Sequence, residues 1–67
     1  MNRKKLGKKL KELRNRKKLS IAEVSRAVGV KQSAISNYET GYRIPRDETK
    51  IKLANLYGVS PIIFFET

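Results

Sequence analysis

The apolar residues between positions 20 and 40 recur with helical spacing in two short runs. In the first run, Ile21, Val24 and Val28 are three and four residues apart, which places them on one helical face. Gly29 then interrupts the pattern. Glycine enters a left-handed conformation at little cost, as a sharp turn after a helix requires. The segment therefore predicts two helices joined by a tight turn.

The second of these helices, at about 31–40, has two chemically different faces. Ala34, Ile35 and Tyr38 share an apolar face that we expect to point inward. The other face carries short or neutral polar side chains, which have the donors and acceptors needed to read base edges. These side chains belong to Gln32, Ser33, Ser36 and Asn37. Such a face is typical of a DNA-reading helix-turn-helix, although exposed helix surface would also explain the two serines.

The chain before this pair predicts a first helix from residue 2 or 3 to about residue 17. Leu6, Leu10 and Leu13 form a narrow apolar stripe, and lysines cover most of the remaining surface. Solvent or DNA phosphates would both suit these lysines. Gly7 weakens the helix relative to alanine, and so we expect another element to approach closely there.

Several polar groups beside the helix pair are suited to phosphate. Ser20 and Glu23 match the Ser-x-x-Glu capping box, in which two unpaired amides at a helix start are satisfied, and the serine hydroxyl would also suit a phosphate. For Arg46, a salt bridge to Asp47 or Glu48 is the alternative to phosphate binding. The candidate phosphate-binding residues are Ser20, Lys31, Thr40, Tyr42, Arg43 and Arg46. Ile44, which lies between Arg43 and Arg46 in the sequence, is expected in the core.

A fourth helix is predicted at about 47–57, with Leu53, Ala54 and Tyr57 as its core stripe. A fifth, at about 60–66, follows the Ser60-Pro61 start signal.

The fifth helix carries four consecutive large apolar residues, which are Ile62, Ile63, Phe64 and Phe65. A short helix spreads them around most of its circumference and cannot bury them all. We expect Ile62 or Phe65 inside and at least two of the four exposed. The exposed residues would be either an apolar chain end or the seam of a homodimer.

Composition narrows the function further. The 67 residues suffice for one domain, expected over 1–67, and their formal charge of +10 favours a polyanionic partner over a merely well-solvated surface or an acidic membrane. There is no cysteine or histidine, and so we expect no metal site, no cofactor and no enzymatic activity. No small-molecule ligand is evident. Without a membrane span or signal peptide in the sequence, we expect a cytoplasmic protein.

One set of residues at fixed spacing resembles a known family. The set comprises Leu10, Leu13-Arg14, Lys18-Leu19-Ser20, Glu23-Val24, Gly29-Val30, Ile35-Ser36, Tyr38-Glu39, Gly41, Pro45, Leu53-Ala54 and Gly58-Val59-Ser60. Together they closely resemble the lambda-repressor-like helix-turn-helix family, the Cro/cI or Xre type of phage repressors and small bacterial regulators. Ile21, Ser25 and Lys50 depart from that pattern, since members often carry glutamine, alanine and an apolar residue there.

The resemblance implies an all-α fold of five helices, with the third helix in the major groove of double-stranded DNA. It also implies an ion pair between Arg14 and Glu39 that ties the first helix to the end of the third. The function expected from it is a sequence-specific transcriptional regulator, acting as a dimeric repressor on a near-palindromic operator. The alternative is an antitoxin or adaptor whose C-terminal apolar surface binds a partner protein.

Overall fold

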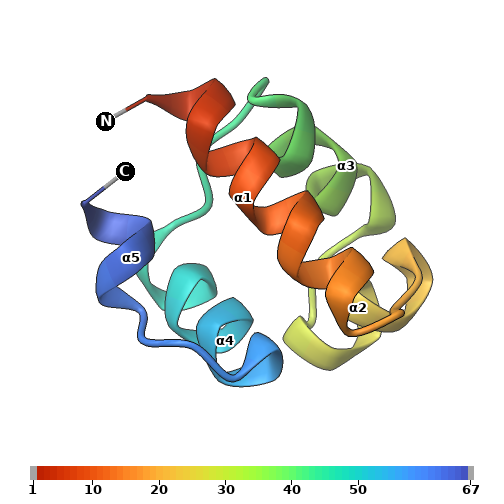
Figure 1. Ribbon diagram of the computed structural model, residues 1–67. Helices are drawn as coiled ribbons and strands as arrows, with labels where there is room; N and C mark the ends of the chain where they lie inside the picture. Colours follow the sequence, from red (N-terminus) through yellow and green to blue (C-terminus); the bar gives the residue numbers. More distant parts are fainter. Residues whose placement is uncertain (1, 67) are drawn as a thin grey trace.

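Five helices account for most of residues 2–66, the part of the chain that this computed structural model describes (Figure 1). In chain order they are α1 (Arg3–Arg16), α2 (Ile21–Val28), α3 (Gln32–Thr40), α4 (Asp47–Tyr57) and α5 (Ile62–Phe65). The expected all-α fold is therefore confirmed, with helix ends within two residues of their predicted positions. Met1 and Thr67, the ends of the expected domain, lie outside the described residues.

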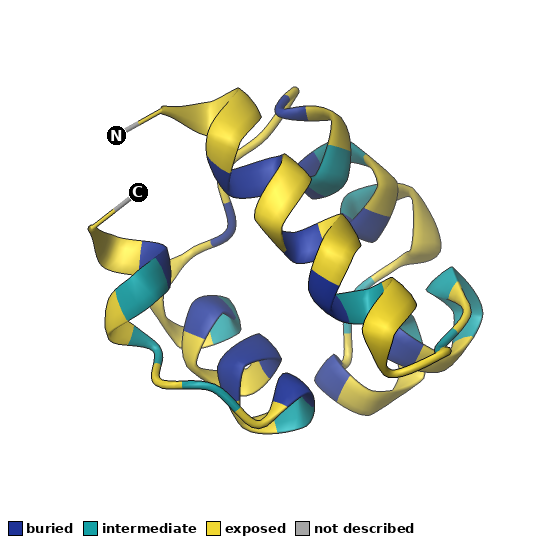
Figure 2. Cartoon of the chain, in the orientation of Figure 1, coloured by how far each residue is buried: buried dark blue, intermediate teal, exposed yellow. Residues whose placement is uncertain are grey.

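The core receives side chains from all five helices (Figure 2). Its buried apolar residues are Leu6, Leu10, Leu13, Val24, Val28, Ile35, Tyr38, Leu53, Ala54, Tyr57 and Phe64. The predicted apolar stripes thus point inward, with Ile21 and Ala34 partly buried at the margin.

The prediction that Ile44 is buried is wrong. Ile44 is 41% exposed, and its neighbour Pro45 is the buried residue. The segment ahead of α4 is not helical, and Arg46 has the extended ψ of 159°. Neighbouring side chains of an extended backbone point to opposite sides, so only one of two successive residues faces the core.

Helix α1 lies directly against the last turn of α3, and Gly7 permits this approach. A Cβ atom built on Gly7 would lie 2.5 Å from the backbone oxygens of both Tyr38 and Glu39. These are backbone atoms that cannot rotate away. The glycine therefore sets the distance between the two helices, as the sequence indicated.

We expect Gly7→Ala to lower the free energy of unfolding by about 1–3 kcal/mol, because the added methyl group forces α1 away from α3. The sign is opposite to that for an open helix, where alanine stabilises by about 1 kcal/mol relative to glycine. Urea denaturation measures the change. Asn15→Ala, at an exposed position of the same helix, is the control and should leave stability unchanged or slightly raised. Equal stabilisation by both substitutions would contradict the close approach.

Only one side chain of α5 enters the core, and it is not the one expected. Phe64 is fully buried, whereas Ile62 is 58% and Phe65 42% exposed, so the prediction of Ile62 or Phe65 inside is wrong. At least two of the four residues are exposed, as expected. Residues of a helix point about 100° apart, and so a single turn presents one large side chain to one core.

Lys50 of α4 is almost fully buried, at 3% exposure. Its ammonium lies 4.7 Å from the centroid of the Phe65 ring, within the range of a cation–π contact. This lysine stands where the family commonly has an apolar residue, and the contact joins α4 to the end of α5.

Candidate nucleic-acid interface

The start of α2 is organised by its capping box. The Ser20 Oγ accepts a hydrogen bond of 3.0 Å from the Glu23 amide, and the Ser20 amide donates one of 2.9 Å to Glu23 Oε1. The bond from the Ser20 backbone lowers the pKa of the Glu23 carboxyl. Ser20 is exposed, and a hydrogen bond with its side chain lowers the pKa of the Glu23 carboxyl further.

The turn between α2 and α3 is held by Ser25. Gly29 adopts the predicted left-handed conformation, with φ of 73°, and its amide donates to the Ser25 carbonyl at 2.9 Å. The Val30 amide donates to the same carbonyl at 3.2 Å, while the Ser25 Oγ donates to the Val30 carbonyl at 2.5 Å. Ser25 stands where the family that the sequence resembles often has alanine. Its hydroxyl therefore adds a hydrogen bond across the turn.

The outer face of α3 carries the four residues predicted to read bases. Gln32, Ser33 and Ser36 are exposed and Asn37 is half-buried. Ile35 and Tyr38 are buried on the opposite face, which holds this polar face outward. The four side chains lie on two successive turns of one helix, and so a single groove of DNA can meet them all.

Exposed groups suited to phosphate lie at both ends of α3. Lys31 occupies the N-cap position, and the loop after the helix follows Gly41. That loop folds back on α3, since the Arg43 amide donates to the Asn37 carbonyl at 3.2 Å. Within the last turn of α3, the Thr40 hydroxyl donates to the same carbonyl, also at 3.2 Å. Every predicted phosphate-binding residue is exposed, namely Ser20, Lys31, Thr40, Tyr42, Arg43 and Arg46.

The alternative partner of Arg46 is not adopted. Across residues 2–66, no carboxylate lies within salt-bridge distance of its guanidinium, and Glu48 instead pairs with Lys52 at 3.4 Å. Arg46 precedes α4 as its N-cap residue. Its charge is therefore available to a partner outside the chain.

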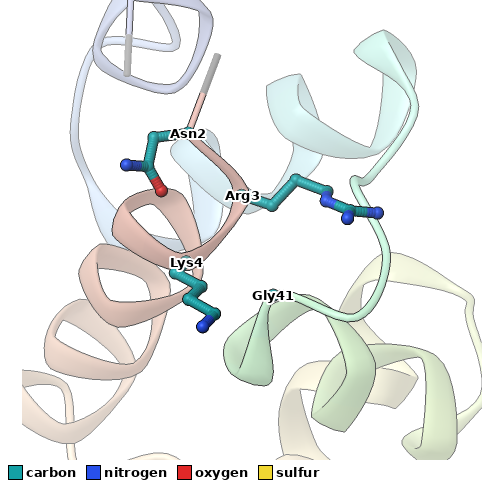
Figure 3. Close-up of a pocket in the computed structure, with 4 residues that line it drawn as sticks. All are labelled: Asn2, Arg3, Lys4 and Gly41. Atoms are coloured by element: carbon teal, nitrogen blue, oxygen red, sulfur yellow. The ribbon is translucent and has the colours of Figure 1, made fainter.

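Two further basic residues, which we did not assign to the site from the sequence, lie beside the loop that follows α3. Figure 3 shows Arg3 and Lys4, at the start of α1, next to Gly41. The approach is close, because a Cβ atom on Gly41 would lie 3.0 Å from the Cα atom of Lys4. With Asn2, these residues line an open hollow of about 560 Å³. Gly7 could have indicated the position of Lys4, because it marks the face of α1 that another element approaches and Lys4 lies on that face one turn earlier.

An ion pair between Arg14 and Glu39 connects α1 to α3. Arg14 Nε lies 2.6 Å from Glu39 Oε2, and Arg14 Nη2 donates to Glu39 Oε1 at 3.0 Å. Arg14 Nη1 also donates to the Leu19 carbonyl at 2.9 Å. The hydrogen bond to Glu39 raises the pKa of Arg14, and burial raises the pKa of the nearby Tyr57 to about 12. The Glu39 carboxylate thus has a positively charged partner inside the fold.

Residues 2–66 contain no cluster of three acidic, histidine or cysteine side chains able to hold a metal ion. None of the helices in that range is long and apolar enough to cross a bilayer.

Comparison with known proteins agrees with this geometry. The helix-turn-helix family profile matches residues 10–64. The HTH-type transcriptional regulator ImmR of Bacillus subtilis (strain 168) is 42% identical over 55 residues, which cover 82% of this chain and 43% of ImmR. The chain thus spans less than half the length of that relative. With the profile covering most of its residues and the turn formed as described, the chain belongs to the lambda-repressor-like, Xre-type helix-turn-helix family.

Proposed function

We propose that this protein is a sequence-specific double-stranded DNA-binding transcriptional regulator that acts as a dimeric repressor. The observation that carries the proposal is the outward polar face of α3, with exposed basic side chains at both ends of the helix. The similarity to ImmR, a transcriptional regulator by name, supports it.

In this mechanism α3 enters the major groove and its polar face meets base edges. Gln32 and Asn37 suit adenine, which offers an acceptor at N7 and a donor at N6, while serine hydroxyls are less selective. The basic side chains around α3 bind DNA phosphates and supply much of the affinity. They also make the affinity fall steeply with salt. A bound dimer would repress by blocking access of polymerase to the promoter.

The proposed dimer uses the part of α5 that the fold leaves available. Phe64 is committed to the core, so of the four predicted seam residues, Ile62 and Phe65 present the most apolar surface to solvent, with Ile63 partly buried. Exposed apolar patches on small proteins often mark association sites. Two copies would place their α3 helices in successive major grooves, ~34 Å apart.

Two substitutions separate base reading from phosphate binding. Gln32→Ala should weaken binding to the best site by about 1–3 kcal/mol and relax selectivity at one position, because it removes contacts to a base edge. Arg43→Ala should weaken binding to every sequence alike, because phosphates are uniform. Titration of operator and random duplexes at equal salt measures both. An equal loss on the two duplexes for Gln32→Ala would count against base reading.

Selection from a random duplex pool, at ~0.15 M salt, tests the proposal as a whole. A recovered near-palindrome with half-sites about one helical turn apart is expected from a dimeric reader. A single short site would leave base reading standing but remove the dimer. Binding without any enriched sequence would reduce the function to association by charge.

A further inference from the structure

A second surface is formed by the first half of α1 and by α5 with the residue that follows it. The two helices enclose an open groove of about 540 Å³. Its lining consists of Lys5, Lys8, Lys9, Glu12, Ile63 and Glu66. None of these residues belongs to the DNA-reading face described above.

The groove lies on the side of α1 opposite to α3. Gly7 marks the α3 side, because its backbone touches the carbonyls of Tyr38 and Glu39. At about 100° per residue, Lys5 and Lys9 both lie ~160° around α1 from Gly7. In the proposed mode of binding, DNA on α3 lies away from Lys5 and Lys9, and these two lysines have no part in base reading.

The chemistry of the groove favours a peptide over a nucleic acid. Its apolar contribution is Ile63, which is partly buried against the core. Glu12 and Glu66 add two carboxylates. A phosphate backbone carries a charge at every nucleotide, so it would meet these carboxylates and gain nothing from the isoleucine. A peptide can place its acids selectively and keep an apolar side chain between them.

The spacing of the lysines suits such a peptide. Lys5 and Lys9 are four residues apart on one helix, so their side chains start about 6 Å from each other. Two acidic residues four apart on a second helix have the same spacing. An apolar residue on the same face of that helix would then lie over Ile63, in the manner of helix-in-groove recognition.

We propose that the groove between α1 and α5 is a docking site for an acidic, amphipathic helical segment of a partner protein. The partner binds without occupying α3. The site is thus separate from the base-reading face of α3 and can be tested independently of it, although its Ile63 is also one of the four predicted seam residues.

The probe is a fluorescein-labelled synthetic helix of about 15 residues, with glutamates four apart and leucines beside them on one face. Fluorescence anisotropy gives its Kd for the purified chain at ~0.1 M salt. Lys5→Glu with Lys9→Glu should weaken binding about tenfold, because two attractive pairs become repulsive. A probe with serine for leucine should bind several-fold more weakly, as should Ile63→Ser.

The control is Lys4→Glu with Lys11→Glu, which changes the charge equally but lies within about 60° of Gly7, on the α3 flank. It should alter probe binding less than twofold and weaken duplex binding more than the groove pair does. Circular dichroism verifies that both pairs remain folded. Equal loss of probe binding with the two pairs, equal binding of the serine probe, or no saturable binding below ~1 mM would overturn the site. Displacement of the probe by a short duplex would assign the groove to nucleic acid instead.

Discussion

Arg14→Ala should lower the free energy of unfolding by about 3–5 kcal/mol, which is enough to leave a domain of this size largely unfolded at room temperature. The side chains of Arg14 and Glu39 are only 12% and 7% exposed. Removing the guanidinium leaves the Glu39 carboxylate buried without its two hydrogen bonds, and it also frees the Leu19 carbonyl. Urea denaturation followed by circular dichroism measures the loss.

The exposed pair between Lys52 and Glu48 is the matched control, since Lys52→Ala should cost less than about 0.5 kcal/mol. Glu39→Ala and the double substitution complete a cycle that isolates the pairing energy. The double variant should be more stable than the sum of the two single losses predicts. Simple additivity would mean that Arg14 stabilises the fold by packing alone.

Phe64→Ala should cost about 3–5 kcal/mol, because it removes a fully buried ring from a core with few large side chains. Phe64 is also the side chain through which the single turn of α5 enters the core. Its loss should detach α5 from the body formed by α1 to α4. Thermal or urea unfolding measures the effect, and amide exchange of residues 62–66 should show α5 opening first.

Ile62→Ala provides the comparison within the same helix. Ile62 is mostly exposed, so the substitution should change the stability of the monomer by less than about 0.5 kcal/mol. It should instead weaken self-association if Ile62 belongs to the dimer seam, which sedimentation equilibrium measures. A large loss of monomer stability with Ile62→Ala and a small one with Phe64→Ala would contradict the described orientation of α5.

The elements that the sequence predicted well all carry local signals. The capping box at Ser20, the glycine at position 29 and the apolar spacing in α1 to α4 act within a few residues, so each is legible without the fold. The exposure of the α3 polar face follows from the same spacing. Its role in reading DNA stays a prediction until binding is measured.

One turn lacked such a signal. The end of α1 has no glycine, yet Lys18 adopts a left-handed conformation with φ of 56°. It lets the Leu19 amide donate to the Arg14 carbonyl at 3.1 Å, which closes the helix. A lysine there is unfavourable locally, and packing of the helices on either side outweighs that cost.

The sequence by itself determined the number of helices, their approximate limits and the outward polar face of α3, because these depend on periodicity and caps within each segment. Only the tertiary structure decided that Phe64 rather than Ile62 or Phe65 is buried, and that Pro45 replaces Ile44 in the core. It also decided the groove between α1 and α5. Such choices depend on how segments distant in sequence meet, and no local pattern records that geometry.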